Sequence, residues 1–232
     1  YVLTTSGLSK KYGKFQALDD LSMHIPKGAI YGFVGRNGAG KTTLIRLICG
    51  LQAPTQGAYS IYGIDYTDKA IGKSRRRMGA VVETPSIYLD MTAEDNLKQQ
   101  ALILGLPSYD SIPEILKLVG LDNTGKKRVR NFSLGMKQRL GIAVALMGNP
   151  DFLVLDEPVN GLDPQGIIEI RELILKLNKE KQITVLISSH ILDELSRLAT
   201  HYGFIDKGRL VKEISATELE AACRKCIRVE VT

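Results

Sequence analysis

The stretch that decides the fold is AIYGFVGRNGAGKTTLIRLICG, residues 29–50. Residues 29–34 form an apolar run of strand length, and residues 41–49 have the apolar spacing of an amphipathic helix that Gly50 closes. The residues that join them, GRNGAGKT at 35–42, fit the pattern G-x-x-x-x-G-K-[ST]. A buried strand, a glycine-rich turn and a helix in this order predict a phosphate-binding loop at the edge of an α/β sheet.

Each residue type in this loop has a physical reason. The glycines permit backbone angles that turn successive N–H groups inward, where they cradle anionic oxygens. The helix that begins at Lys41 adds its positive end, the Lys41 ammonium reaches the β- and γ-phosphates, and the Thr42 hydroxyl can bind Mg²⁺. We therefore expect a nucleoside triphosphate, with Mg²⁺, to be bound by Gly35, Arg36, Asn37, Gly38, Ala39, Gly40, Lys41, Thr42 and Thr43.

Two acidic residues follow a second apolar run, FLVL at residues 152–155. Ligands of open α/β sheets bind outside the carboxyl ends of the strands. We therefore expect Asp156 to hold Mg²⁺, and Glu157 to poise or deprotonate the attacking water. A third apolar run, residues 183–188, leads to His190, which could approach the same crevice. From position alone, a histidine at a helix N-terminus without a ligand is the simpler interpretation of His190.

Apolar runs alternate with helical patterns along the chain, which is typical of an α/β sheet. Pro164 opens a helix that is expected to end near Lys179. The first 30 residues and residues 201–214 are interpreted as antiparallel strands, and DKGR at residues 206–209 as a hairpin turn.

The middle of the chain has no strong strand between about residues 85 and 149. TAED at residues 92–95 resembles a capping box for a helix that ends near Gly105, and further helices are expected at residues 112–119 and 136–147. We therefore expect one domain, residues 1–232. Residues 1–85 and 150–232 would form a core with an antiparallel β subdomain, and residues 86–149 a helical insertion.

Composition excludes several classes of protein. The chain has 232 residues and a net charge of +6, and no apolar run approaches the roughly 20 residues of a membrane span. The basic runs at residues 75–77 and 126–130 lack interleaved aromatic residues, so we interpret them as solvated faces and expect no nucleic-acid partner. Three cysteines indicate a reducing compartment, and the Cys223–Cys226 pair lacks the second pair that a zinc site needs.

A further motif, NFSLGMKQR at residues 131–139, lies just before the strand that carries Asp156. It resembles the signature of ATP-binding cassette (ABC) proteins, which is usually LSGGQ followed by basic and glutamine residues. The other motifs of that family follow in order over essentially the whole chain. The resemblance implies a RecA-like P-loop NTPase core with an antiparallel β subdomain and a helical insertion. It also implies that Tyr12 stacks on adenine, that Glu157 is the catalytic glutamate, that Asp163 belongs to the D-loop, and that His190 is the switch histidine.

The same resemblance implies partners. ABC ATPase domains pair head to tail, so that ATP lies between the phosphate loop of one subunit and the signature of the other. The signature residues here are Ser133, Leu134, Gly135 and Met136. We expect a homodimer that attaches to separate transmembrane permease subunits at the cytoplasmic face of the cell membrane.

Three residues depart from the family pattern. Leu134 replaces a glycine, Met136 replaces a glutamine, and Glu83 falls where the Q-loop glutamine is usual. Glutamine both donates and accepts hydrogen bonds, whereas an ionised glutamate only accepts, although Glu83 could still contact Mg²⁺ through water. These departures, together with residues 85–97, resemble the branch that serves bacitracin-type and lantibiotic-immunity exporters.

The expected function is that of an ATP-hydrolysing subunit that powers a membrane exporter, with antimicrobial resistance or immunity as its role. The alternative is a soluble ABC ATPase that acts on ribosomes or DNA, although the chain has neither a second cassette nor a long coiled coil. A GTPase or small-molecule kinase is disfavoured because EK, not x-D, follows Asn178 and Lys179. A strand-like stretch at residues 227–231 suggests that a C-terminal region is missing, and the cargo is not specified.

Overall fold

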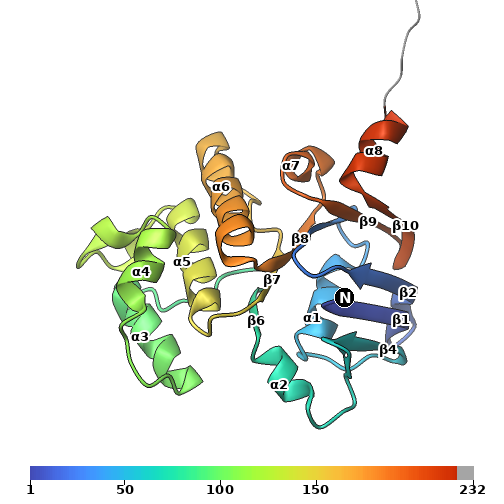
Figure 1. Cartoon of the computed structure of the whole chain (residues 1–232), viewed down its shortest axis with the longest axis horizontal. Coiled ribbons are helices and arrows are strands. Elements are labelled where there is room, and N and C mark those ends of the chain that lie inside the picture. The colour runs from blue at the N-terminus through green and yellow to red at the C-terminus, as the bar shows by residue number, and fades with distance from the viewer. Residues whose placement is uncertain (224–232) are drawn as a thin grey trace, which may run out of the picture.

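A computed structural model of the chain describes residues 1–223 (Figure 1). The strands are β1 (Leu3–Tyr12), β2 (Phe15–Ile25), β3 (Ile30–Val34), β4 (Gln56–Ile61), β5 (Ile64–Asp65), β6 (Met78–Val81), β7 (Phe152–Asp156), β8 (Thr184–Ser189), β9 (His201–Asp206) and β10 (Arg209–Ser215). The helices are α1 (Lys41–Ile48), α2 (Ile71–Arg75), α3 (Ala93–Leu104), α4 (Ile112–Leu118), α5 (Leu134–Leu146), α6 (Pro164–Lys181), α7 (Leu192–Ser196) and α8 (Ala216–Cys223), with 3₁₀ turns at Asp122–Thr124 and Val129–Asn131.

A six-stranded sheet forms the centre, in the order β10-β9-β3-β8-β7-β6. Neighbouring strands from β9 to β6 are parallel, and only β10 pairs antiparallel. Along β7, Phe152 and Val154 join one apolar cluster, whereas Leu153 and Leu155 join the other. The strand is fully buried because both faces of the sheet are covered, as expected for parallel strands.

A second sheet covers one end of the molecule. It has four strands in the order β2-β1-β4-β5, all antiparallel. Helix α1 packs between this sheet and the central one, and its Leu44, Ile45, Leu47 and Ile48 are buried in the shared cluster. Figure 1 shows this sheet and α1 at one end, with α3, α4 and α5 at the other. The phosphate loop therefore lies where the two sheets meet.

The helical part of the chain carries the local signals that its sequence predicted. The Thr92 hydroxyl accepts a hydrogen bond from the Asp95 N–H, and Asp95 bonds back to Thr92, which confirms the capping box. Gly105 ends α3 in the left-handed conformation. Helix α5 begins at Leu134, two residues before its expected start at Met136, because the Ser133 side chain caps it.

The expected hairpin turn is confirmed between β9 and β10. Lys207 and Gly208 both have positive φ, 46° and 81°, as a two-residue turn of this twist requires. The sequence left residues 51–84 without elements, whereas the structure places β4, β5, α2 and β6 there. The expected strand at residues 227–231 and Cys226 lie outside the described residues. None of the helices within residues 1–223 has the length and apolar character that a bilayer crossing requires.

Candidate functional site

The phosphate loop joins the carboxyl end of β3 to the start of α1. Gly40 has φ of 111°, and a side chain there would place its Cβ 2.6 Å from the Ala17 carbonyl oxygen. A Cβ on Gly35 would lie 2.5 Å from the Ile205 carbonyl oxygen. Both positions therefore require glycine for space, and Gly40 also for its backbone angle. Gly38 has φ of 80° but open space around it.

Lys41 is 4% exposed and is the first residue of α1. Its ammonium donates to the carbonyl oxygens of Gly35 and Arg36, at 2.7 and 3.2 Å. It also lies 3.1 Å from Oε1 of Glu157. A buried charge needs such partners because desolvation disfavours it otherwise. The loop thus holds the Lys41 ammonium next to the residues that the sequence predicts to bind the phosphates.

Asp156 ends β7 and is 2% exposed. Its Oδ1 accepts a 2.6 Å hydrogen bond from the Ser188 hydroxyl, whereas its Oδ2 is buried without a partner among the described residues. A cavity of about 480 Å³ is lined by both Asp156 and Thr42. An unsatisfied carboxylate oxygen beside a hydroxyl is the oxygen-ligand chemistry that Mg²⁺ prefers, so the residues fit this ion.

Glu157 follows directly and has φ of 47°, which is costly for a residue with a side chain. Its N–H donates to the Ser188 hydroxyl at 2.9 Å. Its Oε1 contacts Lys41, and its Oε2 lies 3.2 Å from Nδ1 of His190. The structure therefore brings the two acids and His190 together at the carboxyl ends of β7 and β8, as the sequence predicted.

Tyr12 was expected to stack on adenine and Glu83 to contact Mg²⁺ through water. In this structure each of them bonds to another side chain of the chain. The Tyr12 hydroxyl bonds to Gln52, and the ring is 41% exposed. Phe15, which faces Tyr12 across the hairpin, lines the 250 Å³ cavity above the loop together with Thr43. Stacking of adenine on Tyr12 stays a prediction, and Phe15 becomes a second candidate for stacking on adenine. Glu83 lines the larger cavity, but its carboxylate pairs with Arg46.

The signature residues lie at the start of α5. The Ser133 hydroxyl accepts from the Met136 N–H at 3.2 Å. Leu134 is 47% exposed and lines the 480 Å³ cavity, and a Cβ on Gly135 would have only one neighbour, at 3.9 Å. Asp163 caps α6 in the same manner by accepting from the Gly166 N–H. The N-terminus of α5 is therefore open toward solvent.

Sequence reasoning missed two further residues that the structure places at the site. Ser188 bonds both Asp156 and Glu157. Gln138 is 6% exposed, lines the 480 Å³ cavity, and its Oε1 has no partner among the described residues. A polar residue at the end of an apolar strand was the available signal for Ser188, and a glutamine within the signature motif was the signal for Gln138.

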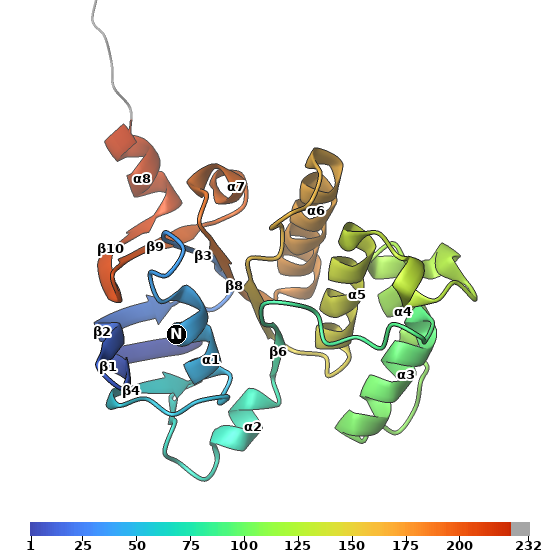
Figure 2. The ribbon, with the colours of Figure 1, turned by 180° about the vertical axis from the view of Figure 1, so that it is seen from behind.

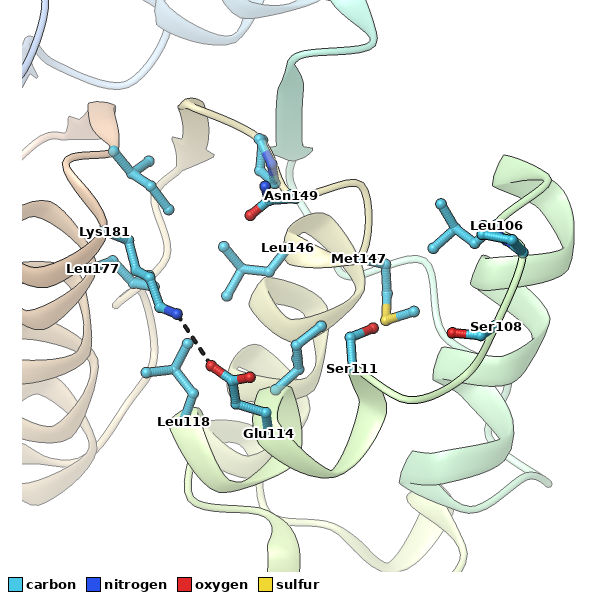
Figure 3. Close-up of a pocket in the computed structure, with 14 residues that line it drawn as sticks. Leu106, Ser108, Ser111, Glu114, Leu118, Leu146, Met147, Asn149, Leu177 and Lys181 are labelled. Carbon is cyan, nitrogen blue, oxygen red and sulfur yellow. Dashed lines mark hydrogen bonds and ion pairs between the residues drawn. The ribbon is translucent and has the colours of Figure 1, made fainter.

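A separate cavity of about 370 Å³ lies between α4, α5 and α6 (Figure 3). Its lining is mostly aliphatic, and its Lys181 already pairs with Glu114 at 3.1 Å. Asn149 and Ile183, which line it, precede β7 and β8. The cavity therefore lies at the amino ends of these strands, opposite the phosphate loop, and has no free cation for a nucleotide among its described residues.

The fold and the site define a P-loop nucleoside triphosphatase: a glycine-rich loop with a buried lysine after β3 faces two acids at the carboxyl end of β7, a parallel strand that β8 separates from β3. The sequence profile of the ABC transporter family matches residues 18–160. The chain belongs to this family, and it is an ATPase subunit of the kind that powers transport.

Curated relatives extend the likeness over the whole chain. The bacitracin transport ATP-binding protein BcrA of Bacillus licheniformis is 47% identical over 231 residues, which is 100% of this chain and 75% of that protein. The lantibiotic transport ATP-binding protein SrtF of Streptococcus pyogenes is 42% identical over 91% of this chain and 90% of its own length.

Solved structures agree with the fold. CbiO1 of Clostridium perfringens, part of the ABC transporter complex cbiONQ, superposes with a TM-score of 0.86 at 29% identity and covers 95% of this chain and 91% of its own. The dimeric cassette MJ0796, bound to ADP and Pi after hydrolysis, superposes with a TM-score of 0.82 at 25% identity over 92% of this chain and 98% of its own.

Proposed function

We propose that the chain hydrolyses ATP in a head-to-tail homodimer and thereby powers an exporter of peptide antibiotics such as bacitracin or lantibiotics. The observation that supports this class of cargo is the 47% identity to a bacitracin transport protein. This identity extends over 231 residues, whereas the family profile matches only residues 18–160. The site geometry supports the chemistry.

Lys41 and Glu157 would exchange partners when ATP binds. In this structure Lys41 neutralises Oε1 of Glu157. An entering triphosphate offers Lys41 a more highly charged partner, which frees Oε1 to accept a proton from the attacking water. The water oxygen then bonds to the γ-phosphorus as the bond to ADP breaks. His190, held at Oε2 of Glu157, would keep the carboxylate oriented and hydrogen-bond the γ-phosphate.

Thr42 and Asp156 would hold the metal. When bound, Mg²⁺ would supply positive charge that offsets the negative charge developing on the phosphate oxygens. Within residues 1–223, no three histidine, cysteine, aspartate or glutamate side chains gather as a metal cluster. The remaining ligands would therefore be water and phosphate oxygens, which suits the reluctance of Mg²⁺ to lose its hydration shell.

The signature of a partner subunit would complete the site. Ser133 caps α5, whose first N–H groups carry partial positive charge, and the adjacent Leu134 is 47% exposed. The γ-phosphate bound by one subunit could thus accept hydrogen bonds from Ser133 and Gly135 of the other. Leu134 and Met136 would make this half-site more apolar than usual.

Attachment to a permease would place the chain at the cytoplasmic face of the membrane. Helix α3 ends in three exposed apolar residues, Leu102, Ile103 and Leu104, at 61%, 63% and 44% exposure. Neighbouring apolar residues that are exposed in a row indicate a protein contact. This surface therefore supports a membrane-protein partner.

Glu157→Gln tests the catalytic assignment. The amide keeps the size of the side chain but cannot accept the proton of the attacking water. We expect ATP binding to be retained within a fewfold and the turnover rate to fall by at least about 100-fold, the lower range for loss of a general base. Fluorescent-nucleotide titration and phosphate release measure the two quantities. Normal turnover in this variant would contradict the assignment.

Copurification tests the partner. The chain is expected to bring down a transmembrane permease from solubilised membranes of its own host, and loss of either protein should increase sensitivity to bacitracin or a lantibiotic. Recovery of ribosomes or DNA without a membrane protein would instead support the alternative of a soluble ABC ATPase.

A further inference from the structure

Glu83 adds a third carboxylate to the cavity that contains the candidate metal site. It follows β6, whose Val81 pairs with Leu155 of β7, so the carboxyl ends of the two strands lie at the same edge of the sheet. Figure 2 shows β6 from behind, where it follows α2, and α5 packs against it. The 480 Å³ cavity is lined by Glu83 together with Asp156 and Glu157.

This carboxylate creates an electrostatic problem for a triphosphate site. Lys41 is already paired with Glu157, and ATP brings several further negative charges. Like charges a few ångströms apart repel each other by amounts that are substantial wherever water is partly excluded. Glu83 is 53% exposed, so water screens part of this repulsion, and a cation beside Glu83 would reduce the remainder even with Mg²⁺ at Asp156.

Arg46 supplies that cation. It lies four residues after Thr42 on α1, so the two side chains share one face of the helix. Its guanidinium pairs with Oε1 of Glu83, and the two side chains are 37% and 53% exposed. Glu83 has φ of 60° and lies in a bend after β6, where it lines the cavity. The pair thus joins the helix of the phosphate loop to the loop after β6.

We propose that Arg46 is a positioning residue for ATP hydrolysis: it neutralises Glu83 and holds this carboxylate at the rim of the cavity, so that the site accepts a triphosphate despite its third acid. The inference deepens the proposed function and rests on ATP binding at the loop of residues 35–42. Arg46 does not touch the reacting atoms. It acts through Glu83, and its importance disappears if Glu83 carries no charge.

A double-mutant cycle tests this role. Arg46→Gln is expected to raise the KM for ATP about two- to fivefold, the range that exposed ion pairs give, with a smaller change in kcat. Arg46→Lys should recover most of the loss because it keeps the charge. In a Glu83→Gln background, whatever that change does alone, Arg46→Gln should add no further increase. The effect of Arg46→Gln should also shrink at high ionic strength, because salt screens exposed charges.

Arg77→Gln provides a matched control. Arg77 pairs with Asp151, with 50% and 40% exposed side chains, and both residues precede β6 and β7 at the opposite edge of the same sheet. Its loss should leave the KM for ATP unchanged. An equal effect of Arg46→Gln with and without Glu83, or an equal effect of Arg77→Gln, would overturn the role of Arg46 while leaving the proposed function intact. Normal turnover in Glu157→Gln would overturn the proposed function. The double-mutant cycle of Arg46 and Glu83 could still be evaluated in that case, because it compares the KM for ATP.

Discussion

Ser188 supports both acids of the site through one hydroxyl. It donates to Oδ1 of Asp156 at 2.6 Å and accepts from the N–H of Glu157 at 2.9 Å. The second bond satisfies the N–H of a residue whose φ of 47° is strained. A single buried side chain thus orients Asp156, the proposed metal ligand, and holds the backbone from which Glu157, the proposed catalytic base, projects.

Ser188→Ala should therefore weaken both stability and catalysis. It leaves buried groups without a partner, which costs about 1–3 kcal/mol of unfolding free energy. Because Ser188 supports Asp156, the proposed metal ligand, turnover should fall about 10- to 100-fold. Urea denaturation and phosphate release measure these effects. Thr184→Val is the control, since Thr184 accepts from the Gly28 N–H at the other end of β8. It should reduce stability but not turnover, and an equal loss of turnover would argue against a specific role for Ser188.

At the scale of elements, the phosphate loop uses its glycines for different reasons. Gly40→Ala adds a clash with the Ala17 carbonyl oxygen, 2.6 Å from the new Cβ, to a φ of 111°. Gly38→Ala meets nothing within 4 Å and has only its φ of 80° to overcome. We expect Gly38→Ala to cost about 1–2 kcal/mol of unfolding free energy. Gly40→Ala should cost more than about 3 kcal/mol, because overpacking adds to the strain. Equal losses on chemical denaturation would contradict this geometry.

The sequence predicted those elements whose signals are local. The strand–loop–helix around Lys41, the capping box of α3 and the turn after β9 all depend on neighbours within a few residues. The sequence did not predict β6, because this strand has only four residues and contains Gly79. A Cβ on Gly79 would lie 2.3 Å from the Ala145 carbonyl oxygen. Such a glycine looks like a turn in sequence, although its actual reason is the close approach of α5.

The site was predictable to the same extent. Asp156, Glu157 and His190 each follow an apolar run, so their shared edge could be expected from sheet topology. The roles of Ser188 and Arg46 depend on the register of β8 against β7 and on the position of the loop after β6. These are long-range pairings, and no local pattern specifies them.

At the scale of the whole molecule, two apolar clusters separate two functions. One cluster joins α1 and the four-stranded sheet to the central sheet, and the other joins α3–α6 to its opposite face. The phosphate loop belongs to the first part and the signature helix α5 to the second (Figure 1). A head-to-tail dimer would therefore place the phosphate loop of one subunit against the start of α5 in its partner. Substitutions in the signature can then be tested without changing the phosphate loop of the same chain.

Ser133→Asp should prevent the ATP-dependent dimer. Aspartate caps a helix as well as serine does, so α5 and the unfolding free energy should be preserved. Its negative charge, however, would face the γ-phosphate of the partner's ATP and repel it. Ser133→Asn caps equally well without a charge and should still dimerise. In a Glu157→Gln background, where ATP is not consumed, light scattering with ATP should detect a dimer for Ser133→Asn and a monomer for Ser133→Asp. Dimers of both variants would exclude Ser133 from the interface, because a carboxylate against a triphosphate could not be tolerated there.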